Sequence, residues 1–138
     1  MRVSARVQNV HGQHHVTLRT NDNAHSLTIP PKSTGFGSSV NGGEWLFLAL
    51  ATCSCNDLYR EAAKRGLKID HVEVEVAGEF GAEGEPARNI TYRATVAAQA
   101  SEAEIRALMY QTDRGAEIQH TLRVATPVTW SSIEVVVG

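Results

Sequence analysis

The feature that most constrains the fold is a run of apolar residues over positions 45–51. On a helix these residues are apolar on every side, whereas the continuation over residues 57–65 carries charge on one side only. Such a helix begins inside a core and ends in water. We therefore expect one long helix over residues 42–65, with cover required around its first half and on one side of its second half. In that second half the buried stripe is expected to consist of Leu58, Tyr59, Ala62 and Ala63.

Residues at the two ends of this segment support the predicted bounds. Asn41 is a good N-cap, and Glu44, three residues later, can return a hydrogen bond to the Asn41 backbone in a capping box. Gly66 follows the last charged turn, where a helix commonly ends in a glycine. The caps thus predict the same helix as the hydrophobic pattern.

Alternating apolar residues on both sides of the helix predict antiparallel strands. Before the helix, this period-two spacing predicts a three-stranded meander that ends at Pro30 and Pro31, since proline cannot donate to a ladder. The elements expected after the helix are a hairpin over residues 72–76 and 90–96, a helix opened by a Ser101–Glu104 capping box, a short helix over residues 116–122, and a closing strand over residues 126–137.

This order of elements predicts an α+β fold that forms one domain over residues 1–138. Two antiparallel sheets of about three strands each can cover one side of a helix, but the first half of the long helix needs cover on all sides. A second copy of the chain supplies that cover. We therefore predict an obligate, intertwined homodimer, with antiparallel sheets wrapped around two long central helices.

Composition excludes several classes of partner. The chain has 138 residues, 42% of them hydrophobic, and a net charge of −2 without a block of like charge. There is no basic patch for nucleic acid or for anionic lipid, and no apolar run approaches the ~20 residues that span a bilayer. The first six residues lack the apolar core of a signal peptide. These features predict a cytoplasmic protein without a nucleic-acid or membrane partner.

The chain has two cysteines, Cys53 and Cys55, and both lie in the predicted long helix. Two thiols separated by one residue form neither a disulfide framework nor a zinc pattern. On a helix they point about 200° apart, so they cannot bond to each other unless the helix unwinds. Cysteine is often simple core filler, and Cys55 is expected to be a packed thiol. Cys53 lies where burial ends, so it is either core filler or a reactive group.

The segment Thr34-Gly-Phe-Gly37, followed by Gly43-Glu-Trp-Leu-Phe-Leu-Ala-Leu-Ala-Thr-Cys-Ser54, resembles the OsmC/Ohr family, that is, osmotically inducible protein C and organic hydroperoxide resistance protein. The resemblance covers nearly the whole chain and is most specific in the helix. It implies an intertwined α+β homodimer and a stress-response activity, the thiol-dependent reduction of organic or lipid hydroperoxides. It places Cys53 at the peroxidatic position and Glu44 at or beside a glutamate that helps to hold an arginine near the thiolate.

The chain departs from that family pattern at two points. The second, resolving cysteine of active members is expected near Ala116, but no cysteine lies there. The arginine of the first hairpin has no clean counterpart, which leaves Arg19, or Arg6 further back, as substitutes. Since a thiolate needs a neighbouring cation, His120 and Arg123 are further candidates for that partner.

Glu44 and the histidines each allow two interpretations. Nine residues separate Glu44 from Cys53, which corresponds to ~13.5 Å along a helix and about half a turn around it. Glu44 therefore either only caps its helix or acts on the Cys53 of a partner subunit. The histidines of the first hairpins, which are His11, His14, His15 and His25, are either scattered surface residues or metal ligands. No known ligand pattern includes them, so we expect neither a metal nor a cofactor.

Two functions follow from these observations. The first is an OsmC-like hydroperoxide reductase in which Cys53 is the sole attacking thiol, with Glu44 and Arg19 as supporting residues, and an external thiol reduces the resulting sulfenic acid. The second is a dimeric binding protein that retains an apolar interface cleft around Trp45, Phe36 and Met109 but has lost the redox cycle. The absent resolving cysteine favours the second function.

Overall fold

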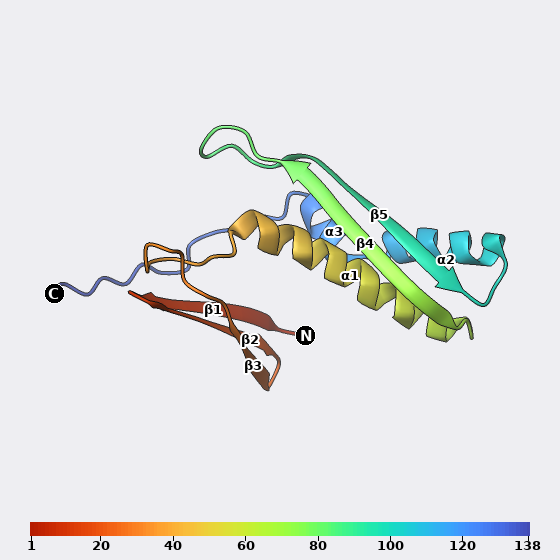
Figure 1. Ribbon diagram of the computed structural model, residues 1–138, viewed down its shortest axis with the longest axis horizontal. Coiled ribbons are helices and arrows are strands. Elements are labelled where there is room, and N and C mark those ends of the chain that lie inside the picture. Colours follow the sequence, from red (N-terminus) through yellow and green to blue (C-terminus); the bar gives the residue numbers. More distant parts are fainter. The chain divides into compact units, whose positions relative to one another are not determined.

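The computed structural model describes residues 1–138, which form two compact units, residues 1–46 and residues 47–138. Figure 1 shows the elements in chain order. Their bounds are β1 Val3–Val10, β2 Gln13–Thr20, β3 Asn23–Thr28, α1 Gly42–Lys64, β4 Ile69–Glu79, β5 Arg88–Ala98, α2 Glu102–Arg114 and α3 Glu117–Arg123. The α+β class is confirmed, and the prediction of one domain stays a prediction.

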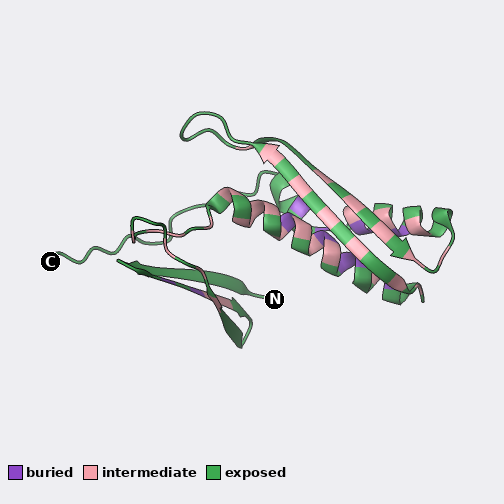
Figure 2. Ribbon diagram, in the orientation of Figure 1, coloured by how far each residue is buried: buried purple, intermediate pink, exposed green.

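The first unit contains the predicted meander, a three-stranded antiparallel sheet in the order β1-β2-β3. Gly12 and Asn21 make the two turns with φ of 75° and 50°, a left-handed conformation that glycine and asparagine tolerate best. All eight residues of β1 are exposed. His14 and Val16 on β2 are the buried residues of this unit, as the purple patch on its sheet shows in Figure 2.

The second unit packs the β4–β5 hairpin against α1 and α2. Leu58 and Ala62 of α1 and Leu108 of α2 are each no more than 2% exposed and form its core. Alternate residues of both strands are half-buried, and those of the inner face include Val72 and Val96, which pack against the same core. The predicted hairpin and the predicted long helix are therefore confirmed.

Gly78 marks a close approach in this unit. A Cβ atom at residue 78 would lie 2.8 Å from the ring of Phe47 and 3.1 Å from Ile90, which is too close for two carbon atoms. The Phe47 ring in turn stacks on Phe80, with ring centroids 5.9 Å apart. The glycine thus allows an aromatic pair to lie across the end of β4.

The predicted helix caps are present. At the start of α1, the backbone N–H of Asn41 donates to Glu44 and the N–H of Glu44 donates to the Asn41 side chain, at 3.1 and 2.8 Å. Ser101 and Glu104 form the same capping box at α2. Gly66 follows α1 with a φ of 66°, as a C′ glycine does.

Three predictions about this fold are wrong. Residues 126–137 form no strand, because a strand exists only when a neighbouring strand pairs with its backbone, and no segment of this chain does so. The second sheet accordingly has two strands rather than three. Tyr59 is 47% exposed and Ala63 is also exposed, so neither belongs to the buried stripe of α1. No helix has the length and apolar character needed to cross a membrane.

Candidate functional site around Cys53

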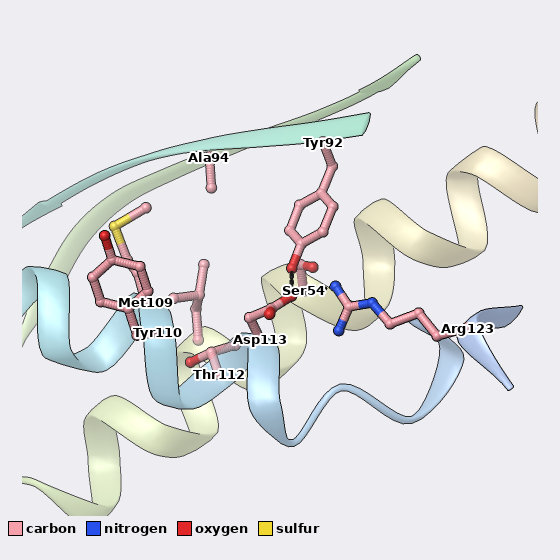
Figure 3. A pocket seen from close by; sticks show the side chains of 9 residues that line it. Ser54, Tyr92, Ala94, Met109, Tyr110, Thr112, Asp113 and Arg123 are labelled. Carbon is pink, nitrogen blue, oxygen red and sulfur yellow. Dashed lines mark hydrogen bonds and ion pairs between the residues drawn. The ribbon is translucent and has the colours of Figure 1, made fainter. Parts of the chain in front are cut away.

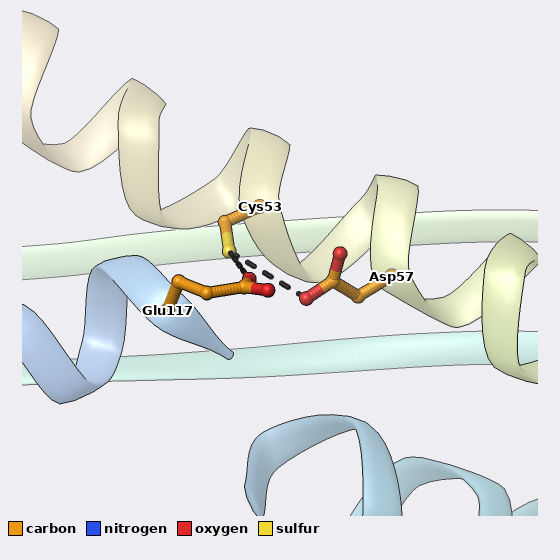
Figure 4. A group of neighbouring side chains, drawn as sticks. All are labelled: Cys53, Asp57 and Glu117. Carbon is orange, nitrogen blue, oxygen red and sulfur yellow. Dashed lines mark hydrogen bonds between the residues drawn. The ribbon is translucent and has the colours of Figure 1, made fainter. Parts of the chain in front are cut away.

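Cys53 lies on the side of α1 that faces α3, and the carboxylates of Asp57 and Glu117 lie close to its sulfur (Figure 4). Asp57 is four residues further along α1, so its side chain shares a face with that of Cys53. The thiol lies 3.7 Å from Asp57 Oδ2 and 4.0 Å from Glu117 Oε2, both within reach of a weak S–H donor. Cys53 is half-buried and, like Cys55, is a free thiol.

Helix α3 brings Glu117 to this position. Ala116 precedes the helix and is fully buried, which fixes the start of α3 against the unit. Gln119, 3% exposed, donates from Nε2 to the Leu50 carbonyl at 3.1 Å and to Ser54 Oγ at 2.8 Å. These two bonds tie α3 to the turn of α1 that also carries Cys53.

Asp57 is the buried member of the group, with 5% of its surface exposed. Its Oδ1 atom forms an ion pair with Arg60 Nη1 at 3.0 Å, while its Oδ2 atom accepts a hydrogen bond from the thiol. Burial raises the pKa of Asp57 above its ordinary value, and the Arg60 guanidinium opposes that rise. The Arg60 side chain itself is 47% exposed.

The surroundings of Cys53 favour its protonated form. Burial raises the pKa of this thiol, the negative charges of Asp57 and Glu117 raise it further, and the backbone N–H of Ile118 opposes them. Of the two candidate cations in this unit, Arg123 pairs with Asp113 at 2.8 Å and His120 is exposed on α3. The charged side chains that act on the thiol are Asp57 and Glu117, both acidic.

Glu44 and Arg19 belong to the first unit. Glu44 is exposed and engaged in its capping box. Arg19 is an exposed residue of β2, opposite Ser4 of β1 and Ala24 of β3. The cap accounts for the position of Glu44, and the catalytic roles of both residues stay predictions.

A pocket of about 400 Å³ opens between α1, β5 and α2 in the second unit (Figure 3). Met109, one of the residues expected around an apolar cleft, lines it together with Leu58 and Ala94. At its polar end, Tyr92 and Arg123 both donate hydrogen bonds to Asp113 Oδ1. Burial, with the Asp113 carboxylate beside it, raises the pKa of Tyr92 to about 12.

Sequence reasoning missed Asp57 and Glu117 as members of the site. One signal was present in each case. Asp57 follows Cys53 at the helical spacing of four, and Glu117 lies next to the position where the resolving cysteine of the family was expected. A thiolate needs a neighbouring cation, and that requirement favoured arginines and histidines over these carboxylates.

The chain belongs to the OsmC-like protein family, whose sequence profile matches residues 35–131. This match includes α1 and the whole second unit up to the segment after α3. The resemblance found in the helix sequence is thereby confirmed. No individually curated protein matches the sequence.

Solved structures with this fold come from several bacteria. An OsmC-like protein of Mycoplasma pneumoniae superposes with a TM-score of 0.61 at 18% identity, over 87% of each chain. An OsmC-like hydroperoxide resistance protein from Jannaschia sp. gives 0.55 at 12% identity, over 91% of this chain and 89% of the other. An organic hydroperoxide resistance protein OsmC from Legionella pneumophila gives 0.58 at 15% identity, over 89% and 90%. At these identities the comparisons establish the shared fold.

Proposed function

We propose that the protein reduces organic hydroperoxides with Cys53 as its only attacking thiol. The observation that carries the proposal is a half-buried thiol, within the residues that match the family, in hydrogen-bond contact with the proton acceptor Asp57. Two of the solved relatives are described as hydroperoxide resistance proteins. Cys55 lies on the same intact helix, pointing elsewhere, so the reaction has no resolving cysteine within α1.

The proposed reaction uses Asp57 as a general base. The thiol proton moves to the carboxylate while the sulfur attacks the terminal oxygen of the hydroperoxide. The O–O bond breaks, an S–O bond forms, and the departing alkoxide takes the proton, which yields an alcohol and a sulfenic acid on Cys53. An external thiol then forms a mixed disulfide and releases water, and a second thiol restores Cys53.

The test is the consumption of cumene hydroperoxide in the presence of dithiothreitol. Cys53→Ser is expected to abolish consumption, whereas the matched variant Cys55→Ser retains it. A rate that Cys53→Ser leaves unchanged contradicts the proposal.

We further propose that a homodimer completes the site. Apolar side chains at three places are open to solvent in the single chain: Leu48 of α1 is 52% exposed, Val7 of β1 60% and Trp130 of the last segment 85%. A second copy of the chain can cover these surfaces, since in a two-fold symmetric dimer the same apolar patch of each subunit lies in the interface. In this dimer Arg19 supplies the cation for the thiolate and Glu44 supports it from the partner subunit.

Mixed dimers test this arrangement. If Glu44 of one subunit serves Cys53 of the other, Cys53→Ser and Glu44→Gln subunits mixed after unfolding recover activity that neither has alone. Glutamine preserves the capping box, so the Glu44→Gln helix stays intact. The peroxide consumption of Arg19→Ala is compared with that of Arg6→Ala. If only Arg6→Ala loses activity, Arg6 rather than Arg19 supplies the cation for the thiolate. No recovery in mixed dimers contradicts the exchange between subunits.

A second function, binding without catalysis, is favoured by the acidic surroundings of the thiol and by the pocket at Tyr92. In this pocket Tyr92 and Arg123 already donate hydrogen bonds to Asp113, so the other lining residues, such as Leu58 and Met109, offer apolar contacts to a ligand. A binding protein of this kind captures an apolar fluorescent probe, and Met109→Trp, which fills the pocket, reduces that binding. The binding function is supported if the probe binds and Cys53→Ser leaves peroxide consumption unchanged.

A further inference from the structure

Cys53, Asp57 and Glu117 bring one thiol and two carboxylates together, and the thiol proton is the only hydrogen-bond donor that these three side chains contribute. Their nearest ligand atoms all lie within 4.8 Å of one another. The thiol has a single proton, yet its sulfur lies within hydrogen-bond range of both carboxylates. One guanidinium, that of Arg60, compensates this charge, and it does so from the far oxygen of Asp57. The centre of the group therefore has an excess of negative charge.

We propose that these three side chains bind a divalent transition-metal cation of the Zn²⁺ class, with a thiolate and two carboxylates as ligands. The donor set is chemically suited to such an ion, because Zn²⁺ accepts both cysteine sulfur and carboxylate oxygen. The site does not depend on the peroxide reaction. Three protein ligands leave a fourth tetrahedral position open for water or another small ligand.

The distances are close to those of a formed site. With Zn–S of ~2.3 Å and Zn–O of ~2.0 Å, a tetrahedral centre separates sulfur from oxygen by ~3.5 Å. The observed separations from the sulfur are 3.7 Å to Asp57 and 4.0 Å to Glu117, so these two pairs need to contract by no more than about half an ångström. The two carboxylate oxygens lie within 4.8 Å of each other and must approach to ~3.3 Å, so this pair contracts by up to about 1.5 Å. Glu117 is exposed at the start of α3, and its side chain is free to make that adjustment.

A separate observation comes from the buried carboxylate. Asp57 is 95% removed from solvent, since 5% of its surface is exposed, and its Oδ2 atom is aimed at the centre of the group (Figure 4). This oxygen accepts a weak hydrogen bond from the thiol, itself a proposed ligand, at 3.7 Å. An S–H group is a weak donor, so the hydrogen bond offsets little of the cost of burying a carboxylate oxygen, and a cation at this position would offset more. Arg60, bonded to Oδ1, holds the carboxylate in the required orientation.

Binding of the metal also resolves the proton balance. The Cys53 thiol loses its proton to solvent and forms a metal–sulfur bond, while both carboxylates bind as anions. No oxidation or reduction takes place. Because binding releases the thiol proton, affinity rises with pH.

Titration of the reduced, chelator-treated full chain with Co²⁺ tests the proposal directly. Tetrahedral thiolate coordination is expected to produce a sulfur-to-cobalt charge-transfer band that Zn²⁺ abolishes by displacement. Cys53→Ser is expected to remove this band. The matched variant Cys55→Ser, which alters the neighbouring thiol of the same helix, is expected to retain it. Exposed Glu117 is replaced without disturbing the core, and Glu117→Gln is expected to weaken Co²⁺ binding at least about tenfold.

The outcomes separate this proposal from the proposed peroxidase activity. A band absent from the wild type, retained in Cys53→Ser, or unchanged in affinity by Glu117→Gln overturns the metal site. Peroxide consumption is measured separately on the chelator-treated protein, and its loss or retention leaves the Co²⁺ result as it stands. Circular dichroism of each variant shows that a lost band reflects lost ligands in a folded chain.

Discussion

The two antiparallel sheets have the same kind of sequence pattern but differ in burial. In β4 and β5 the inner residues, such as Val72 and Val96, are half-buried against the helix core. In β1 the apolar residues alternate in the same way, yet Val3 is 63% exposed and Val7 60%. Alternation therefore identifies which residues share a face of a sheet. It does not identify what covers that face, which depends on the other parts of the chain or on a partner.

The largest expected effect tests the covered side of this comparison. Leu108 is 0% exposed and lies between α1 and the hairpin. Leu108→Ala is expected to lower the free energy of unfolding by ~2–5 kcal/mol, because it removes buried methyl groups and leaves a cavity. Urea unfolding at several protein concentrations measures the loss, which should not vary with concentration. A loss below ~1 kcal/mol means that the second unit relaxes around the cavity.

The next effect tests the uncovered side. If a second copy covers β1 as proposed, Val7→Asp introduces a charge into the interface and weakens the dimer at least tenfold, or about 1.4 kcal/mol. Sedimentation measures the dimer dissociation constant. Arg2→Asp also adds an acidic side chain at an exposed position of the first unit, and provides the control. Equal dissociation constants for wild type and Val7→Asp mean that β1 remains solvent-exposed in the assembly.

Much of the fold was predictable because its signals are local. The meander, the long helix, both capping boxes and the second hairpin all follow from spacing within short segments, and each is present. The closing strand was wrong for a nonlocal reason. Residues 126–137 have the composition of a strand, but Val128 and Trp130 are 96% and 85% exposed, without a neighbouring strand to pair with.

The candidate site was predictable only in part. The position of Cys53 on the helix came from the family resemblance and from the change in hydrophobic pattern. The acidic character of its surroundings depends on how α3 packs against α1, since Glu117 is 64 residues away in the sequence. A contact between residues so far apart in the sequence leaves no periodic pattern of apolar residues from which it could be predicted. The expected cation was therefore inferred from chemistry, and the packing supplied carboxylates in its place.

A smaller effect examines the polar end of the covered unit. Burial, with help from Asp113, raises the pKa of Tyr92 from 10.0 to about 12, so the folded state favours the protonated phenol. This contribution to stability is fully present below pH 10.0 and is lost as the pH rises through about 12. Since the phenol is partly solvated, its size is about 1 kcal/mol. Unfolding of Tyr92→Phe at pH 9 and above should therefore show less alkaline loss than the wild type.

The smallest expected effect concerns the contact between α1 and α3. Glu117→Gln removes a negative charge 4.0 Å from Cys53, which lowers the pKa of the thiol and increases the thiolate fraction at a given pH. Alkylation of Cys53 by iodoacetamide in metal-free buffer at neutral pH should become a few-fold faster. Glu102→Gln, an exposed change on α2 away from the thiol, is the control and should leave the rate unchanged. Equal rates for Glu117→Gln and wild type mean that solvent screens Glu117, and that burial and Asp57 together keep the thiol protonated.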